Sequence, residues 1–142
     1  MTTSPTLAKG SCNCGRVQFE VTVALSDVFV CHCSICRKST GSGGIAVAIV
    51  SNENFNWTKG TDLIKTWRKP NHDWLSNFCE KCGSSLPGKN DETATYIPVG
   101  LLDSGHEHLE VKHHLFVGSK GSWEQIQDNG IQHENNFDPK NT

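Results

Sequence analysis

The sequence lacks any long hydrophobic run. Its longest uninterrupted apolar stretch, residues 45–50, is far shorter than the ~20 residues of a membrane-spanning helix, so we expect no membrane association. The first ten residues contain neither a basic segment nor the apolar segment of a secretory signal, which favours a cytoplasmic protein. A basic excess is also absent, because 13 Lys and Arg stand against 15 Asp and Glu for a formal net charge of −2. Nucleic acid is therefore not expected as a partner.

Helical periodicity is weak along the chain, and no linker rich in Pro, Gly or Ser divides it. The 142 residues match one domain in size. We expect a core at about residues 8–120 and a polar tail at residues 121–142. Alternating or continuous apolar patterns predict a mainly β fold. The expected strands lie at residues 17–23, 45–50, 63–67, 73–78, 94–99 and 109–117.

Three details of this pattern are specific enough to test. The run at residues 45–50 is continuous and rich in β-branched side chains, which predicts a strand covered on both faces. One or two helical turns are expected after Ile35, ended by Gly41. In the last expected strand, Val111 and Leu115 should share one face with His113.

Seven cysteines stand out in a chain of this size. In a reducing compartment they are more readily metal ligands than disulfides. They fall into three groups: Cys12 and Cys14; Cys31, Cys33 and Cys36; Cys79 and Cys82. In an extended segment, side chains two residues apart point to the same face, so each C-x-C can chelate one ion. A C-x-x-C followed by glycine forms a tight knuckle with the same capacity.

The first and third groups complement each other. Cys12 and Cys14 with Cys79 and Cys82 would complete the tetrahedron of four thiolates typical of structural Zn²⁺. Such a clamp closes a long loop and supplements a small core. We therefore expect metal removal to unfold the domain.

The middle group leaves three cysteines for a second Zn²⁺. Cys31, Cys33 and Cys36 could leave one coordination position open for chemistry, or a remote histidine such as His72 or His113 could close a second structural site. His32 should point away from that metal, because it lies between two cysteines on one face. An iron–sulfur cluster is disfavoured, since the spacing matches no familiar ferredoxin pattern.

An open zinc with three thiolates suits thiols better than water. The three negative ligands weaken the zinc as a Lewis acid, so binding of a substrate thiol is favoured over water activation. Arg37, next to the central group, is either an anion contact for a peptide-like substrate or a solvated charge. His72 is the best remote candidate for acid–base work.

Four segments together resemble the family of glutathione-dependent formaldehyde-activating enzymes, which is grouped with centromere protein V. The opening motif is Gly-Ser-Cys-Asn-Cys-Gly at residues 10–15, and the central motif is Cys-His-Cys-Ser-Ile-Cys-Arg-Lys at residues 31–38. The third is Phe-Cys-Glu-Lys-Cys-Gly-Ser-Ser-Leu at residues 78–86, and the closing segment is Phe-Val-Gly-Ser-Lys at residues 116–120, with Trp123. The resemblance therefore covers most of the chain.

This resemblance implies a zinc-binding fold of the β-tent type with two zincs. It implies that Cys12, Cys14, Cys79 and Cys82 hold the structural ion and that Cys31, Cys33 and Cys36 hold the ion of the active site. The implied reaction joins formaldehyde to glutathione as S-(hydroxymethyl)glutathione, a carbon–sulfur lyase reaction run backwards. The implied partners are a small thiol such as glutathione and a small carbonyl compound.

The sequence leaves two alternatives to this function open. The same zinc site could act on a different small metabolite by hydrolysis, hydration or sulfur removal. A non-enzymatic β-tent zinc module that binds a protein is the other alternative. It would be favoured by a fourth protein ligand on the second zinc, or by a large exposed apolar patch without an adjoining pocket.

Overall fold

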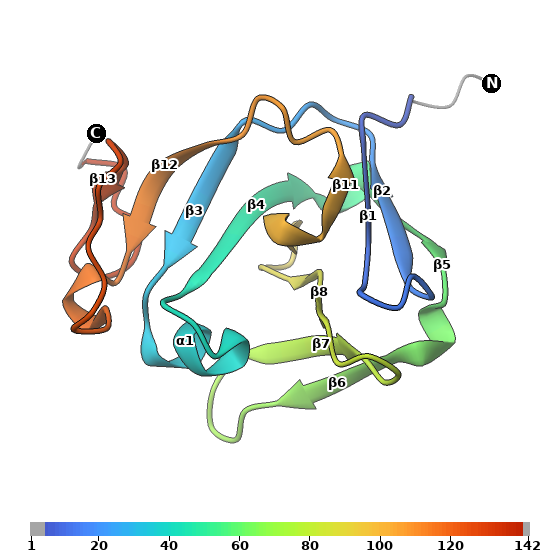
Figure 1. Ribbon diagram of the computed structural model, residues 1–142, viewed down its shortest axis with the longest axis horizontal. Helices are drawn as coiled ribbons and strands as arrows, with labels where there is room; N and C mark the ends of the chain where they lie inside the picture. Colours follow the sequence, from blue (N-terminus) through green and yellow to red (C-terminus); the bar gives the residue numbers. More distant parts are fainter. Residues whose placement is uncertain (1–4, 141–142) are drawn as a thin grey trace.

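The structure, a computed structural model, describes residues 5–140 as a mainly β molecule (Figure 1). The strands are Ala8–Ser11 (β1), Gln18–Val21 (β2), Asp27–Cys31 (β3), Ile45–Ser51 (β4), Phe55–Lys59 (β5), Ile64–Arg68 (β6), Leu75–Cys79 (β7), Ser85–Leu86 (β8), Gly88–Lys89 (β9), Ala94–Pro98 (β10), Leu102–Ser104 (β11), Glu110–Leu115 (β12) and Ile131–Gln132 (β13). The helices are Ser34–Thr40 (α1) and the 3₁₀ turns Asn52–Asn54 (η1), Thr61–Leu63 (η2), Val99–Leu101 (η3) and Val117–Ser119 (η4). Within the described range, no helix has the length and apolar character needed to cross a bilayer. The mainly β, single-domain architecture expected from the sequence is confirmed.

The described strands form three sheets (Figure 1). One has the order β11-β1-β2-β5, the largest has the order β13-β12-β3-β4-β10-β9, and a small one has the order β6-β7-β8. Most neighbours are antiparallel, but β12 runs parallel to both β3 and β13. Helix α1 lies at the end of β3 where the chain turns back into β4, so the large sheet positions it directly.

The main core lies between the first sheet and one face of the large sheet. Strand β2 contributes Phe19 and Val21, which are almost fully buried, while the alternate residue Glu20 is half-buried. From β4, Ala48 and Val50 join the same cluster. Burying side chains of the size of Val or Phe contributes about 1.5–3 kcal/mol each, so this cluster supplies much of the stabilisation of the domain.

Strand β4 presents a second apolar face on the opposite side of the sheet. Ile45 and Val47 point there because side chains alternate along a strand, and they pack in a separate cluster with Cys36 and Tyr96. Ile49, the next residue on that face, is 36% exposed. The prediction that both faces of this strand are covered is therefore wrong at Ile49.

Helix α1 has the short length expected from the sequence. Cys33 is its N-cap, and Gly41 ends it in the left-handed conformation with φ of 68°. The Gly41 N–H donates to the Arg37 carbonyl oxygen at 2.8 Å. Glycine tolerates this conformation without steric cost, which explains why the helix stops there.

A bulge in β12 changes which residues share a face. The register against β3 shifts between Val111 and His113, so these two residues pair with Val28 and Phe29, which are consecutive in β3. They therefore point to opposite faces, and the prediction that Val111 shares a face with His113 is wrong. A single inserted residue reverses the alternation, and the sequence pattern alone does not mark it.

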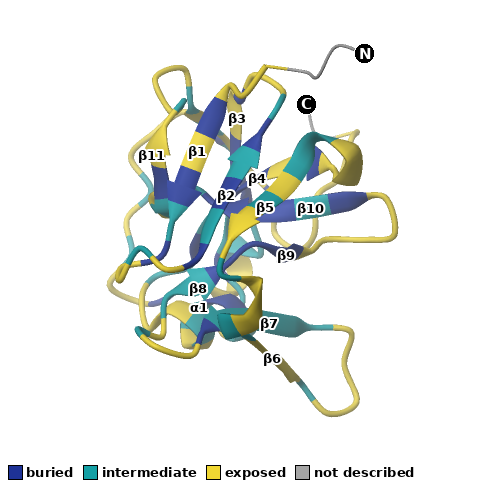
Figure 2. Ribbon diagram, turned by 90° about the vertical axis from the view of Figure 1, so that its right-hand side faces the viewer, coloured by how far each residue is buried: buried dark blue, intermediate teal, exposed yellow. Residues whose placement is uncertain are grey.

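The polar tail packs along β12 instead of leaving the domain. Ile131–Gln132 forms β13, and the Phe116 N–H donates to the Asn135 carbonyl oxygen at 2.7 Å. In Figure 1 this part of the chain, in red, runs beside β12. The hairpin β6–β7, by contrast, extends from the body, and its strand residues are exposed or half-buried except for Cys79, whereas β10 is mostly buried (Figure 2).

Candidate metal centres and the cavities beside them

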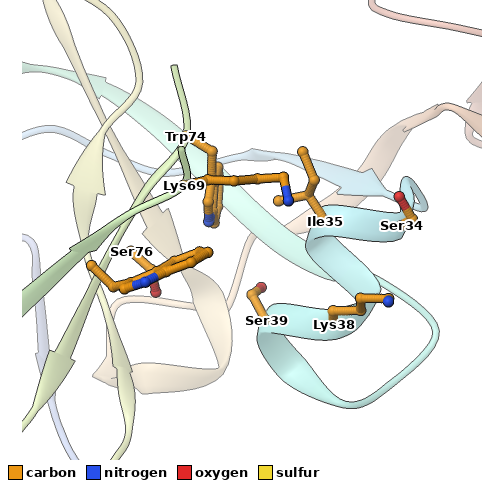
Figure 3. Close-up of a pocket in the computed structure, with 8 residues that line it drawn as sticks. Ser34, Ile35, Lys38, Ser39, Lys69, Trp74 and Ser76 are labelled. Atoms are coloured by element: carbon orange, nitrogen blue, oxygen red, sulfur yellow. The ribbon is translucent and has the colours of Figure 1, made fainter. Parts of the chain in front are cut away.

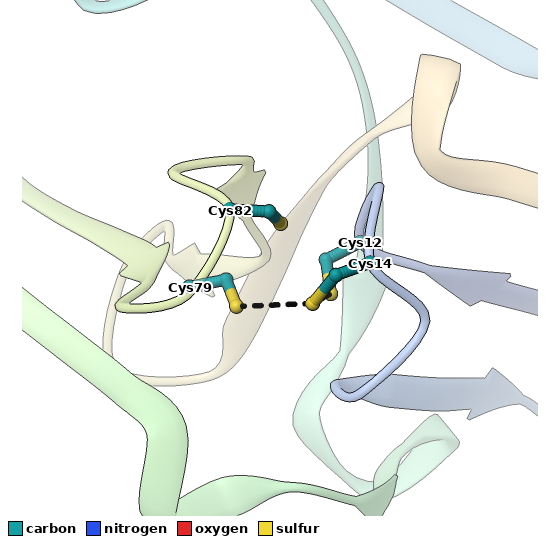
Figure 4. A group of neighbouring side chains, drawn as sticks. All are labelled: Cys12, Cys14, Cys79 and Cys82. Atoms are coloured by element: carbon teal, nitrogen blue, oxygen red, sulfur yellow. Dashed lines mark hydrogen bonds between the residues drawn. The ribbon is translucent and has the colours of Figure 1, made fainter.

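The first cysteine cluster joins the two sheets that carry its halves. Cys12 and Cys14 follow β1, while Cys79 ends β7 and Cys82 lies in the knuckle after it (Figure 4). The Sγ atoms of Cys12 and Cys14 are 3.5 Å apart, those of Cys14 and Cys79 are 3.8 Å apart, and all four lie within 4.8 Å of one another. A zinc tetrahedron with sulfurs at about 2.3 Å has edges of about 3.8 Å, so the four residues fit the ion.

Local backbone geometry prepares these sulfurs as ligands. Gly83 follows the knuckle with φ of 76°, a conformation that favours glycine. The Val17 N–H donates to Cys12 Sγ at 3.4 Å. Hydrogen bonds from Ser84 lower the pKa of Cys82 to about 5. The thiolate is the form that binds metal, so these contacts favour the ligand state.

The second cluster is built at the junction of β3 and α1. Cys31 ends the strand, Cys33 caps the helix, and Cys36 lies in its first turn. The Cys36 N–H donates to Cys33 Sγ at 3.4 Å, and the three Sγ atoms lie within 4.8 Å of one another. A hydrogen bond with Cys36 lowers the pKa of Cys31 to about 6, while the same contact raises that of Cys36. The donor set fits a zinc ion with three protein sulfurs.

No fourth His, Cys, Asp or Glu of residues 5–140 joins these three sulfurs within the same distance. His72 is exposed, and its Nδ1 accepts the Trp74 N–H at 3.1 Å. His113 stacks on Phe29 at 5.0 Å between ring centroids and has its Nδ1 3.0 Å from Nε2 of His133. Neither of the two histidines considered as a fourth ligand is therefore placed with the cluster.

The His32 side chain points away from the cluster and joins a buried chain of hydrogen-bonded side chains. Its Nε2 lies 2.9 Å from Nδ1 of His114, whose Nε2 is 2.9 Å from a carboxylate oxygen of Asp128. His32 and His114 are almost fully buried. The hydrogen bond with His114 lowers the pKa of Asp128. This chain of side chains ties the turn that bears the cysteines to the polar tail.

A cavity of about 380 Å³ opens beside the second cluster, with Cys31 and Cys36 in its wall. One face of β4 and the facing residues of β3 and β10 form its floor, and Phe137 of the tail forms part of its rim. Trp74 stacks on Tyr96 with their centroids 5.8 Å apart. Burial raises the pKa of Tyr96 to about 12, so its hydroxyl stays protonated at neutral pH.

A second cavity, of about 510 Å³, lies between α1 and the β6–β7 hairpin. Its wall includes Lys38 and Ser39 of the helix and Trp67 and Lys69 of the hairpin. In Figure 3 the Lys69 side chain extends towards Ile35 of the helix. Trp74 lines both cavities, so they adjoin at its indole ring.

The two other predicted site residues lie outside both walls. Arg37 is half-buried, and its Nε finds no hydrogen-bond partner among the described residues. Neither Arg37 nor His72 lines either of these two cavities. Sequence reasoning gave no role in the site to Lys38, Lys69 or Phe137, since no motif marks them as cavity residues.

Comparisons with known proteins agree with these observations. The sequence profile of the family described as "Glutathione-dependent formaldehyde-activating enzyme" matches residues 7–119. A Halomonas elongata relative named "Putative glutathione-dependent formaldehyde-activating enzyme" is 27% identical over 128 residues, which cover 85% of this chain and 82% of the relative. The crystal structure of a Rhodobacter sphaeroides protein matches with a TM-score of 0.56 and 22% identity, over 67% of this chain and 87% of that chain. The last likeness is one of fold.

Proposed function

This chain belongs to the family of glutathione-dependent formaldehyde-activating enzymes, and from that premise we propose that it makes or breaks the carbon–sulfur bond of a small thiol adduct. The proposal is a carbon–sulfur lyase of the S-(hydroxymethyl)glutathione synthase type that works in the cytoplasm with two zinc ions per chain. The observation that carries it is the three-sulfur cluster of Cys31, Cys33 and Cys36, which lacks a fourth donor from residues 5–140 and borders a cavity.

The two cysteine clusters take different roles in this proposal. Cys12, Cys14, Cys79 and Cys82 would hold the structural ion, because four thiolates within 4.8 Å of one another can supply all the ligands of a tetrahedral zinc. Zinc held by Cys31, Cys33 and Cys36 would supply a coordination position for a substrate sulfur and favour its thiolate form.

The reaction is balanced without an oxidant or reductant. In the synthetic direction the thiol sulfur bonds to the carbonyl carbon, and the thiol proton passes to the carbonyl oxygen. In the lyase direction the same bond breaks, and the proton returns to sulfur. The Tyr96 hydroxyl, which its raised pKa keeps protonated, donates to the Leu75 carbonyl oxygen at 3.5 Å, so we assign it no role as proton donor to the substrate oxygen.

The charged groups of a glutathione-like thiol need cationic or polar partners. Lys38 and Lys69 line the adjoining cavity, where they would pair with the carboxylates of the thiol substrate. The roles expected for Arg37 and His72 stay predictions, since neither lines the two cavities.

The non-enzymatic alternative has less support. Its two expected marks were a fourth protein ligand on the second zinc and an apolar patch without a pocket. Within residues 5–140 no fourth donor joins Cys31, Cys33 and Cys36, and the exposed apolar side chains of Ile49 and Phe137 border a cavity. Both observations favour a small-molecule site.

Cobalt substitution tests thiol binding directly. We expect glutathione to change the thiolate-to-metal absorption bands of the cobalt-loaded protein, and not those of Cys33→Ser, whose second cluster has lost a ligand. Adduct exchange between glutathione and formaldehyde, followed by NMR, tests the reaction itself. Unchanged cobalt bands in the unsubstituted protein would remove thiol coordination, and exchange no faster than the spontaneous rate would reject the formaldehyde activity.

A further inference from the structure

The floor of the cavity beside Cys31 and Cys36 is an apolar sheet face that is buried at Ile45 and Val47 and open at Ile49. Ile45, Val47 and Ile49 alternate along β4 and all line it. The pairing of strands sets Val47 beside Phe29 of β3 and Ile49 beside Tyr96 of β10. The opposite face of β4 is packed in the main core. An apolar face on the outer side of a central strand, left open at Ile49, is a surface that an apolar ligand can cover.

The wall of this cavity offers little to a charged molecule. None of the Asp, Glu, Lys and Arg residues in the described range 5–140 lines it. Besides the two cysteine thiols, its polar side chains are the amides of Asn90 and Asn136, the Trp74 indole, and Tyr96, whose hydroxyl donates to the Leu75 carbonyl oxygen at 3.5 Å. A carboxylate or ammonium group moved into such a wall would lose its hydration without gaining an ionic partner. The body of glutathione, with two carboxylates and one ammonium group, therefore does not fit this cavity.

The size of the cavity is also wrong for formaldehyde alone. Formaldehyde has two heavy atoms and takes up about the space of two waters, roughly 60 Å³. The cavity measures about 380 Å³, which is in the range of pockets that bury whole small ligands. With formaldehyde as the carbonyl substrate, most of this apolar volume would have no partner.

We propose that this cavity binds an apolar substituent on the carbonyl carbon, so that the preferred substrate is the adduct of a thiol with an aromatic or branched aliphatic aldehyde. This inference rests on the proposed function and names its substrate class. The thiol sulfur bonds to the aldehyde carbon, the thiol proton passes to the aldehyde oxygen, and the reverse step restores both. The charged part of the thiol lies in the adjoining cavity near Lys38 and Lys69, on the far side of Trp74.

Ile49 and Phe137 are the residues that determine this specificity. Their side chains are 36% and 42% exposed, so a change at either alters the cavity more than the core. Each methylene that a ligand buries strengthens binding about fourfold. A phenyl group on the ligand should therefore bind at least tenfold more tightly than a methyl group.

The test compares ligands that do not react. Isothermal titration of the zinc-loaded full chain measures binding of S-benzylglutathione, S-methylglutathione and benzyl alcohol. The last of these lacks the glutathione part and therefore reports on the cavity alone. We expect S-benzylglutathione to bind at least tenfold more tightly than S-methylglutathione. Ile49→Asp should lower the affinity for benzyl alcohol and S-benzylglutathione at least fivefold. The affinity for S-methylglutathione should stay within twofold of that of the unsubstituted protein.

A matched control and a second variant show whether a loss of binding comes from the cavity or from misfolding. Val23→Asp makes the same change at a valine that is 37% exposed and lies outside the cavity wall, so it should leave all three affinities unchanged. Phe137→Ala removes one aromatic side chain from the rim and should lower the affinity for benzyl alcohol several-fold. Thermal unfolding of each variant checks that the fold persists.

The results separate this inference from the proposed function. Equal binding of the benzyl and methyl ligands, or benzyl alcohol binding that neither Ile49→Asp nor Phe137→Ala weakens, would overturn the substrate class. If glutathione changes the cobalt bands but the benzyl group adds no affinity, the proposed function stands and this inference fails. If benzyl alcohol binds and Ile49→Asp abolishes it while glutathione leaves the cobalt bands unchanged, thiol chemistry fails and the apolar ligand class stands.

Discussion

Gly44 lies where β4 approaches the backbone of the second cysteine cluster. A Cβ atom at this position would lie 2.4 Å from the Cys31 carbonyl oxygen and 3.5 Å from Cα of His32. These are backbone atoms, so they cannot move aside as the tip of a flexible side chain could. The absence of a side chain at Gly44 therefore allows β4 to start directly against the ligand-bearing turn.

Gly44→Ala should therefore destabilise the protein by about 1–3 kcal/mol, the usual cost of forcing atoms into a packed site. It should also lower the zinc content towards one ion per chain, because the Cys31 backbone must shift. Urea unfolding and metal analysis measure the two effects. Gly100→Ala is the matched control, since a Cβ there meets nothing within 4 Å. Equal stability and zinc content in both variants would show that the turn is not held by this contact.

At the scale of elements, the polar tail closes one side of the molecule through a few contacts with β12. The His133 N–H donates to the His114 carbonyl oxygen at 2.8 Å, and Asp128 meets the His114 ring. The lowered pKa of Asp128 means that the carboxylate is favoured in the folded state. Its contribution is fully present above its ordinary pKa of 3.8 and is lost as the pH falls through the lower folded value.

Asp128→Ala should release the tail without unfolding the domain. Because the Asp128 side chain is 44% exposed, the loss of stability should be small, about 0.5 kcal/mol. Hydrogen exchange at the backbone amides of Phe116 and His133 should become faster, while exchange in β4 stays slow. Unchanged exchange at His133 would contradict an anchoring role for Asp128.

The elements show why the sequence predicted the cysteine clusters better than the cavities. Spacing of two or three residues places Cys31, Cys33 and Cys36 on one turn, so local geometry decides their grouping. The cavity floor depends instead on strand register, which sets Val47 beside Phe29. Its rim depends on Phe137, about 100 positions beyond Phe29 in the sequence. No local pattern reports such a contact.

Some strands were missed for a related reason. The segments of β1 and β11 are short and carry polar or glycine residues, so their periodicity is weak. Pairing with neighbouring strands stabilises them in spite of this weak local preference, as when β1 lies between β2 and β11.

At the scale of the whole molecule, the two cysteine clusters differ in the length of chain that they close. The four-cysteine cluster joins residue 14 to residue 79 and thus connects β1 to the small sheet. It also has its own apolar surroundings, because Cys12 and Cys79 pack with Val17 and Leu86. The three-cysteine cluster lies within six residues of one turn. Loss of the first should therefore affect the whole fold, and loss of the second should affect one cavity wall.

Loop-closure entropy gives the size of this difference. By the chain-entropy measure used for cross-links, closing a loop of about 65 residues is worth about 4 kcal/mol, and closing one of five residues about 2 kcal/mol. Cys79 is fully buried, so a change there also leaves an imperfectly packed core.

We therefore expect Cys79→Ser to unfold the domain at 37 °C and Cys33→Ser to remain folded with one zinc per chain. Circular dichroism and metal analysis on both variants measure this, and a chelator strong enough to strip both ions should reproduce the Cys79→Ser result in the unsubstituted protein. A folded Cys79→Ser that binds no zinc at the first cluster would show that the two sheets hold together without the clamp.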